Sequence, residues 1–204
     1  MKTGNVKNVA AFEKLVGICN DLGASYDPSK AALTPTALAT LLEQAQQQVQ
    51  AVKRARTTFT LAVNARQETF AGINPLVARV VRALAASENS KQNVRDARLL
   101  KRKLQPRSNP PVPSSTGTGE EGSVPTNSYS SSRLDYESRI DTFSSLLELL
   151  KGCEAYKPNE ADLKLPALNA LLEEMRQSSA AVDKAGQALA MARINRNKVM
   201  IGKD

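Results

Sequence analysis

Apolar residues recur at three- and four-residue intervals through much of this chain, which is the spacing of one face of an α-helix. The first such stretch predicts a helix over residues 5–23. Gly23 is suited to end this helix, because glycine readily adopts the left-handed conformation that follows many helix C-termini. A connector that contains Pro28 comes next. The apolar positions of the first helix are Val9, Phe12, Val16, Cys19 and Leu22.

A much longer helix is predicted after the connector. Thr34 is a suitable N-cap, Pro35 suits the first helical position, and no proline or glycine follows until Gly72. The helix would have about 37 residues and a length of roughly 55 Å. Its apolar seam is narrow and becomes polar toward Arg66, which is typical of a long helix that packs on partner helices in a coiled-coil manner.

Four further helices follow from the same signals. The sequence leaves open whether the first two are one bent helix, although residues 87–90 favour a break. The second of them has about 15 residues, within the usual range of helix lengths in globular proteins. The predicted helices begin at Asn74, at Ser90, near Ser132 (ending at Lys151) and near Pro166 (ending at about Met200).

The chain also repeats itself. Residues 26–72 align with residues 156–202 at a constant offset of 130, with 9 identities in the first 19 positions, where chance gives roughly one. The preceding helix matches at an offset of 131. Each copy contains a Tyr-x-Pro connector, at Tyr26 and at Tyr156. Such self-similarity indicates two copies of one supersecondary unit, namely a helix, a connector and a long second helix.

These patterns predict an all-α protein. Its two homologous long helical hairpins would form an elongated, pseudo-twofold four-helix bundle with additional helices. We expect a first unit at residues 1–104, a flexible linker at 105–131 and a second unit at 132–204. The linker is rich in Pro, Ser and Gly, and cannot bury enough apolar surface to offset the entropy of ordering. Either the second copy is a natural short form, or it lacks a third helix that the first copy has.

Composition agrees with closely packed helices. Hydrophobic residues make up 41% of the chain but aromatic residues only 4%, so the core would be built from Ala, Leu and Val. No apolar run is long enough to span a membrane and no signal core is present, so we expect a cytoplasmic protein. Cys19 and Cys153 each fall where the other copy has leucine, which favours small core hydrophobes over a disulfide or a reactive thiol.

The net charge of +8 is concentrated in one part of the chain. Residues 53–107 carry thirteen basic and three acidic groups, a net charge of +10. Clustered Lys and Arg favour binding to nucleic acid or another polyanion; the alternatives are a solvated face and a surface for an acidic partner. No aromatic residue lies within the densest run of these charges, residues 91–107, so base stacking is unsupported. The candidate nucleic-acid-binding residues are Arg79, Arg82, Lys91, Arg95, Arg98, Lys101, Arg102 and Lys103.

Several kinds of chemistry are excluded. The sequence has no histidine, which removes Ser-His-Asp and Cys-His catalysis and the Glu-x-x-His metal motif. Two cysteines without histidine cannot complete a structural zinc site. The glycine-rich run at residues 116–122 is followed by neither Lys-Ser nor Lys-Thr, so it is not a phosphate loop. We therefore expect no enzyme activity, no cofactor, no metal and no small-molecule substrate.

Two repeated polar features have structural interpretations. Tyr26 and Tyr156 are expected to close the end of each hairpin, with the hydroxyl reaching a helix terminus. Arg66 and Arg196 occupy equivalent seam positions, where a charge must reach water, a carboxylate or a partner. Solvent exposure at the end of a bundle is the favoured interpretation for both arginines.

A set of recurring residues connects the chain to other proteins. They are Ser132, Asp135, Arg139, Phe143, Tyr156, Pro158, Asn159, Glu160, Leu163, Ala192, Arg193 and Arg196 in the second half, with Arg79, Val80, Val81, Ala83, Leu84, Asp96, Ala97 and Arg98 in the first. Through them the chain resembles uncharacterised bacterial tandem helical-repeat proteins of unknown function, a resemblance that implies no activity, cofactor or catalytic residue. We expect a non-enzymatic scaffold or interaction protein that binds a protein partner or itself. The alternative is a nucleic-acid-associated protein that uses residues 79–107.

Overall fold

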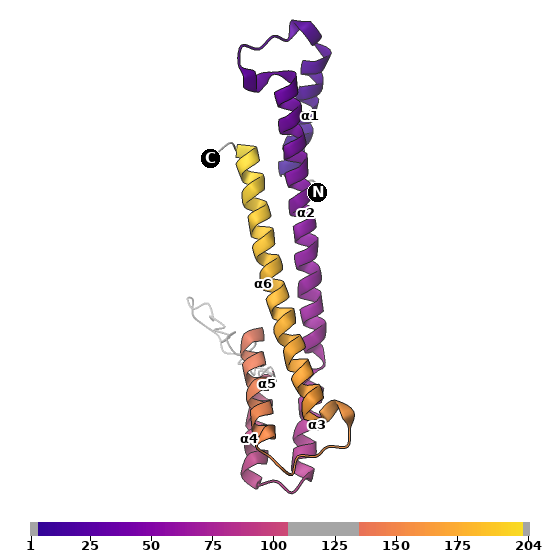
Figure 1. Ribbon diagram of the computed structural model, residues 1–204, viewed down its shortest axis with the longest axis vertical. Helices are drawn as coiled ribbons and strands as arrows, with labels where there is room; N and C mark the ends of the chain where they lie inside the picture. The colour runs from indigo at the N-terminus through magenta and orange to yellow at the C-terminus, as the bar shows by residue number, and fades with distance from the viewer. Residues whose placement is uncertain (1–3, 106–134, 202–204) are drawn as a thin grey trace, which may run out of the picture. The chain divides into compact units, whose positions relative to one another are not determined.

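A computed structural model describes residues 4–105 and 135–201 of the protein. All regular structure in these ranges is helical (Figure 1), which confirms the predicted all-α class. The predicted linker, from residue 106 onward, lies outside the described residues. The elements are α1 (Gly4–Asp21), η1 (Gly23–Ser25), η2 (Ala31–Leu33), α2 (Pro35–Ala71), α3 (Ile73–Ala86), α4 (Lys91–Leu104), α5 (Tyr136–Lys151), η4 (Ala161–Leu163) and α6 (Leu165–Ile201), where η denotes a short 3-10 helix.

The helix ends follow local chemistry. At the start of α2 the Ala37 N–H donates to the Thr34 hydroxyl at 3.4 Å, and this helix has the 37 residues predicted for it. Gly23 follows the end of α1 with φ of +52°, the left-handed conformation that glycine adopts without a Cβ clash. The Ser90 hydroxyl accepts from the Asn93 N–H at 3.1 Å, so α4 begins separately from α3. α5 begins at Tyr136, and its predicted start near Ser132 lies outside the described residues.

The described residues group into two compact units. Unit 1 consists of residues 4–65 and 180–201, and unit 2 consists of residues 66–105 and 135–179, so that α2 and α6 contribute to both. These bounds differ from those of the two units that the sequence predicts, residues 1–104 and 132–204. That division of the chain stays a prediction. None of the helices among the described residues has both the length and the apolar content that crossing a bilayer requires.

Unit 2 has the larger core. α4 packs along α5, and α3 packs on α4 and on η4. The side chains of α5 form the centre of this core, where Phe143 and Leu146 have no exposed surface. Each such side chain contributes about 1.5–3 kcal/mol by its burial. The most fully buried members are Ile73, Val77, Val80, Leu84, Leu104, Phe143, Leu146, Leu147, Leu150, Leu168 and Met175.

Unit 1 has a smaller core, in which Val16 and Cys19 of α1 meet Leu38 of α2. The sequence repeat predicts that Leu38, Leu42, Val52 and Phe59 of α2 are buried like their counterparts in α6, and Leu38 is indeed buried as Leu168 is. The prediction is wrong for Leu42, Val52 and Phe59, which are half-buried, whereas their counterparts are buried. The described part of unit 1 has no helices corresponding to α3 and α4, and Phe59 lies against Gly186, which offers it no side chain.

The two connectors have the same hydrogen bonds. The Tyr26 hydroxyl donates to the Leu33 carbonyl at 2.9 Å, and the Tyr156 hydroxyl donates to the Leu163 carbonyl at 2.8 Å. Both carbonyls end a short 3-10 helix that precedes a long α-helix, so each hydroxyl reaches a helix terminus as predicted. The bounds of η2 and α2 recur in η4 and α6 at the offset of 130 found in the sequence.

Candidate functional site

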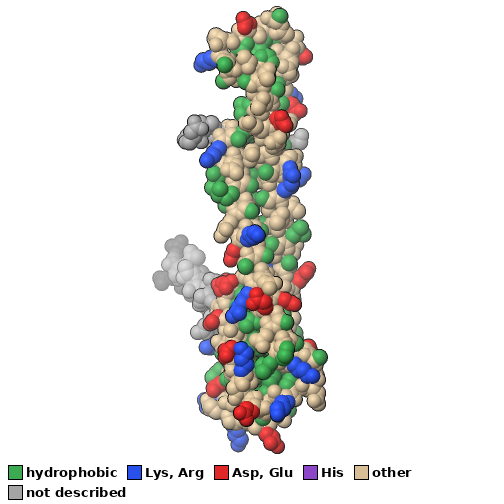
Figure 2. Space-filling model, in the orientation of Figure 1, with side chains coloured by type: hydrophobic (Ala, Val, Ile, Leu, Met, Phe, Trp, Pro, Cys, Tyr) green, Lys and Arg blue, Asp and Glu red, His purple; other side chains and the backbone are tan. Residues whose placement is uncertain are grey.

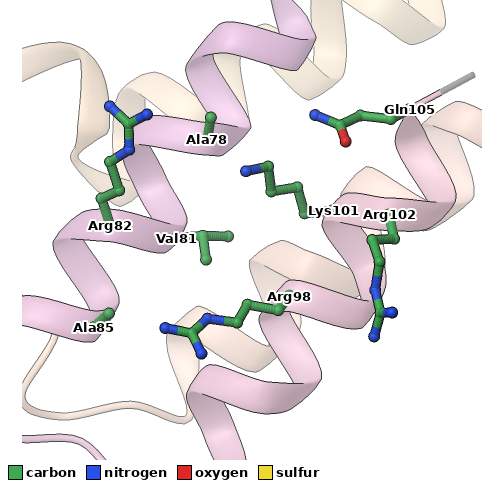
Figure 3. A pocket seen from close by; sticks show the side chains of 8 residues that line it. All are labelled: Ala78, Val81, Arg82, Ala85, Arg98, Lys101, Arg102 and Gln105. Carbon is green, nitrogen blue, oxygen red and sulfur yellow. The ribbon is translucent and has the colours of Figure 1, made fainter.

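An open groove of about 380 Å³ lies between α3 and α4, within unit 2 (Figure 3). Its lining positions are three, four and seven residues apart on each helix, so each helix contributes one face. We call it the basic groove. It is lined by Ala78, Val81, Arg82, Ala85, Arg98, Lys101, Arg102 and Gln105.

Four cations surround an apolar floor in the basic groove. Arg82, Arg98 and Arg102 are exposed and Lys101 is half-buried. Figure 3 shows Lys101 pointing into the space between the helices, and Arg102 pointing away from it. Within residues 4–105 and 135–201, no carboxylate lies within 4.0 Å of these four cations. Cations that have no such partner can bind phosphate or carboxylate groups.

Arg79, by contrast, is held by carboxylates. Its guanidinium donates to Glu160 and, at 2.7 and 3.0 Å, to both carboxylate oxygens of Asp162. The hydrogen bond that Arg79 donates to Glu160, followed by that to Asp162, raises the pKa of Arg79. Arg79 therefore joins α3 to the connector at η4 and is not available to the basic groove.

The remaining candidates lie along α4. Lys91, Arg95 and Lys103 are exposed and do not line the basic groove. The structure thus brings together four of the eight predicted residues. Part of the positive charge also has a structural reason, since Lys101, Arg102 and Lys103 occupy the last turn of α4, where cations interact favourably with the helix dipole. On the face shown in Figure 2, basic side chains are interspersed with acidic ones rather than forming one uniformly basic surface.

A stack of arginines and aromatic rings in unit 2 was missed by sequence reasoning. The Arg66 guanidinium lies 3.8 Å from the centroid of the Tyr136 ring, whose edge-to-face partner at 4.8 Å is Phe70. Arg139 lies 5.1 Å from the Phe70 ring, and burial lowers the pKa of this arginine. The predicted solvent exposure of Arg66 is therefore wrong: this side chain is half-buried, and a cation–π contact takes the place of water.

Other polar groups have structural roles. Cys19 and Cys153 are free and buried, as expected of small core residues. Burial, with a smaller contribution from Asp162 and then Glu160, raises the pKa of Tyr156 to about 12, so its hydroxyl stays protonated and donates to Leu163. In the part of the chain that the structure describes, no group of Cys, Asp and Glu side chains could hold a metal ion.

Unit 1 has an exposed apolar stripe that runs along α1 to Leu22, the residue just after the helix. Leu15, Ile18 and Leu22 are 52%, 58% and 51% exposed, and their spacing places them on one face, turned by about 100° from the buried face of the helix. We call these three residues the α1 stripe. The positions 131 residues later are Leu146 and Leu149 in α5 and Cys153 just after it, of which the first and last are buried and the second is half-buried.

Comparison of the chain with models of protein families, with curated proteins and with solved structures finds no match. The resemblance to tandem helical-repeat proteins therefore has no matching family model behind it. What the protein does must be inferred from its own surfaces, of which the basic groove and the α1 stripe are the two that sequence and structure single out.

Proposed function

We propose that this protein is a non-enzymatic helical scaffold that binds a protein partner through the α1 stripe. The observation that supports this is the difference between equivalent faces: α4 packs along α5, whereas the side chains of the α1 stripe stay about half exposed among the described residues. Clustered exposed apolar side chains on a water-soluble protein usually mark an interaction site. Covering each of the three would contribute about 1.5–3 kcal/mol at most.

The same proposal extends to the architecture. We propose that the two hairpins are copies of one unit, arranged as a pseudo-twofold four-helix bundle to which α3 and α4 are added. The recurrence of helix bounds and of the tyrosine hydrogen bond at an offset of 130 supports this. A cytoplasmic location and membership of the family that the sequence resembles belong to the same proposal.

Photo-crosslinking tests the scaffold function. A photoreactive amino acid at Ile18 should give a protein adduct of defined mass in the native cell, and Leu15→Lys should abolish it. The matched control is the same amino acid at Leu61 on α2, which is 62% exposed but lies outside the stripe. Circular dichroism should show equal helix content in all variants. Equal adducts from the two positions would contradict the proposal.

Polyanion binding is the second candidate function, and the observation that favours it is the set of four cations in the basic groove that have no carboxylate partner among the described residues. Replacing Arg98 and Arg102 by glutamate should weaken binding to DNA or RNA equally for all sequences, because phosphate contacts carry no sequence information. The salt dependence should also become flatter. Lys91→Glu, outside the groove, should have a smaller effect. Absence of binding by the unmodified protein at low salt would exclude this candidate.

A further inference from the structure

We propose that the partner of the α1 stripe is an amphipathic helical hairpin with a carboxylate that faces Lys30. This inference rests on the proposed scaffold function and specifies the chemistry of the partner. It also excludes a second copy of this chain as the occupant. Unit 2 supplies the template, because there a helical hairpin, α3 with α4, already covers the equivalent elements α5 and η4.

Three kinds of contact hold the template hairpin in place. Its apolar ridge, which includes Val80 and Leu84 on α3 and Ala97 on α4, is completely buried. Arg79 is anchored to the acidic connector through Glu160 and Asp162. At the end of α5, the Asn93 amide donates to the Cys153 sulfur at 3.3 Å. A hairpin that docks on unit 1 would meet the same elements with different side chains.

The apolar part of the docking face is retained in unit 1. The counterparts of Leu146, Leu149 and Cys153 are Leu15, Ile18 and Leu22. In unit 1, Leu22 stands in place of Cys153. An asparagine of the partner at the Asn93 position would therefore have no acceptor there, and an unpaired amide is costly to bury. The partner is therefore expected to have an apolar residue at the Asn93 position.

The polar anchor is reversed in unit 1. Lys30 occupies the position of Glu160, and Ala32 occupies the position of Asp162. Lys30 is exposed and has no ion pair within the described residues. A hairpin with arginine at the Arg79 position would lose both carboxylates and meet a like charge, whereas one with glutamate would form an ion pair. Asp27 does not restore the anchor, because it occupies the position of Lys157, which takes no part in holding Arg79.

This reversal argues against a second copy of the chain in two ways. The α3–α4 hairpin of another copy would bring Arg79 to Lys30. Direct pairing of two α1 stripes would bury only three side chains on each partner, each already about half covered, and that is far from the roughly 1,200 Å² of a stable interface. A hairpin with a carboxylate, by contrast, can use the α1 stripe and the connector together.

The test uses the full chain and two synthetic peptides. Both peptides comprise residues 73–104 with Asn93→Leu, and cysteines added at their ends close each into a hairpin through a disulfide. One retains Arg79, and the other contains Arg79→Glu. Circular dichroism should show equal helicity, and fluorescence anisotropy should measure binding to the wild-type chain, to Lys30→Glu, to Ile18→Lys and to the control Leu61→Lys.

The wild-type chain should bind the Arg79→Glu peptide about fivefold more tightly than the Arg79 peptide, as a change from repulsion to attraction at an exposed site allows. Lys30→Glu should reverse this preference. Ile18→Lys should weaken both peptides about tenfold or more, because a buried apolar contact is replaced by a charge. Leu61→Lys should leave both affinities unchanged.

Each of the other possible outcomes would overturn a different part of the proposal. Equal affinity of the two peptides, still lost in Ile18→Lys, would overturn the charge inference and leave the scaffold function standing. Failure of both helical peptides to bind would overturn the helical hairpin as the partner, whereas the scaffold function would be overturned only if Ile18 also gave no specific adduct. A concentration-dependent increase in mass by light scattering that Ile18→Lys abolishes would identify a second copy as the occupant. As an independent measurement, carbodiimide, which joins an amine to a carboxylate with loss of water, should couple Lys30 to the adduct captured at Ile18; an adduct without this link would also overturn the inference.

Discussion

Removing one hydroxyl group from Tyr156 should destabilise the protein more than the same change at Tyr26. Tyr156→Phe keeps the ring and opens no cavity, so the change isolates the hydrogen bond to the Leu163 carbonyl at 2.8 Å. Tyr156 is 6% exposed and Leu163 is 3% exposed, so water has little access to the carbonyl once its donor is lost. We expect a loss of about 1–2 kcal/mol in the free energy of unfolding.

Tyr26→Phe is the matched control. It removes the equivalent bond of 2.9 Å in the other connector. There the tyrosine is half-buried and the bond is exposed, so water can replace the lost hydroxyl. The expected loss is about 0.5 kcal/mol or less. The difference between the two variants therefore measures the effect of burial on one and the same hydrogen bond.

Urea unfolding followed by circular dichroism gives the two free energies, provided that the slope with denaturant is unchanged. Native-state hydrogen exchange should assign the Tyr156 effect to unit 2 and the Tyr26 effect to unit 1. Equal losses, or a larger loss for Tyr26→Phe, would refute the reasoning. They would show that solvent access does not determine how much this hydrogen bond contributes to the free energy of unfolding.

Three other outcomes follow from the described side chains. Because burial raises the pKa of Tyr156 to about 12 from 10.0, its contribution to stability should be complete below pH 10 and lost as the pH rises toward 12; urea midpoints at pH 9 and 11 should show a drop that is smaller in Tyr156→Phe. Gly17→Ala should raise the free energy of unfolding by about 0.5–1 kcal/mol, since a Cβ there meets nothing within 4 Å. Gly23→Ala should lower the free energy of unfolding, because φ at this position is +52°. Thermal unfolding would contradict this reasoning if both substitutions changed stability in the same direction. Phe143→Ala, in the centre of unit 2, should cost about 3–5 kcal/mol, and a loss below about 1 kcal/mol in urea unfolding would show that this core is loosely packed.

The ends of the helices were predictable because they depend on nearby residues. Thr34 and Pro35 specify the start of α2, and the run without proline or glycine up to Gly72 specifies its length. The separate start of α4 was indicated by Ser90, whose hydroxyl does cap the helix. Such signals act within one turn of the chain, so their effect is readable without knowledge of the tertiary structure.

The contacts between distant segments were not predictable in the same way. Nothing in the spacing of α4 indicates that it packs along α5 or that Asn93 meets Cys153, 60 residues away. Arg66 was placed on an apolar seam, but its partner ring belongs to Tyr136, which no helical periodicity connects to it. Likewise, the sequence identifies the four cations of the basic groove as basic residues, while the ion pairs of Arg79 depend on the carboxylates of a later connector.

The two native cysteines allow local opening of each unit to be measured by thiol labelling. One buried thiol lies in each unit, Cys19 in unit 1 and Cys153 in unit 2. A thiol reagent reacts only when the sulfur becomes accessible as the thiolate, so the two labelling rates follow two separate opening equilibria. Reaction at Cys153 requires the Asn93 amide to leave the sulfur. The kinetics of α4 leaving α5 can therefore be followed in the unmodified chain, with no probe introduced into it.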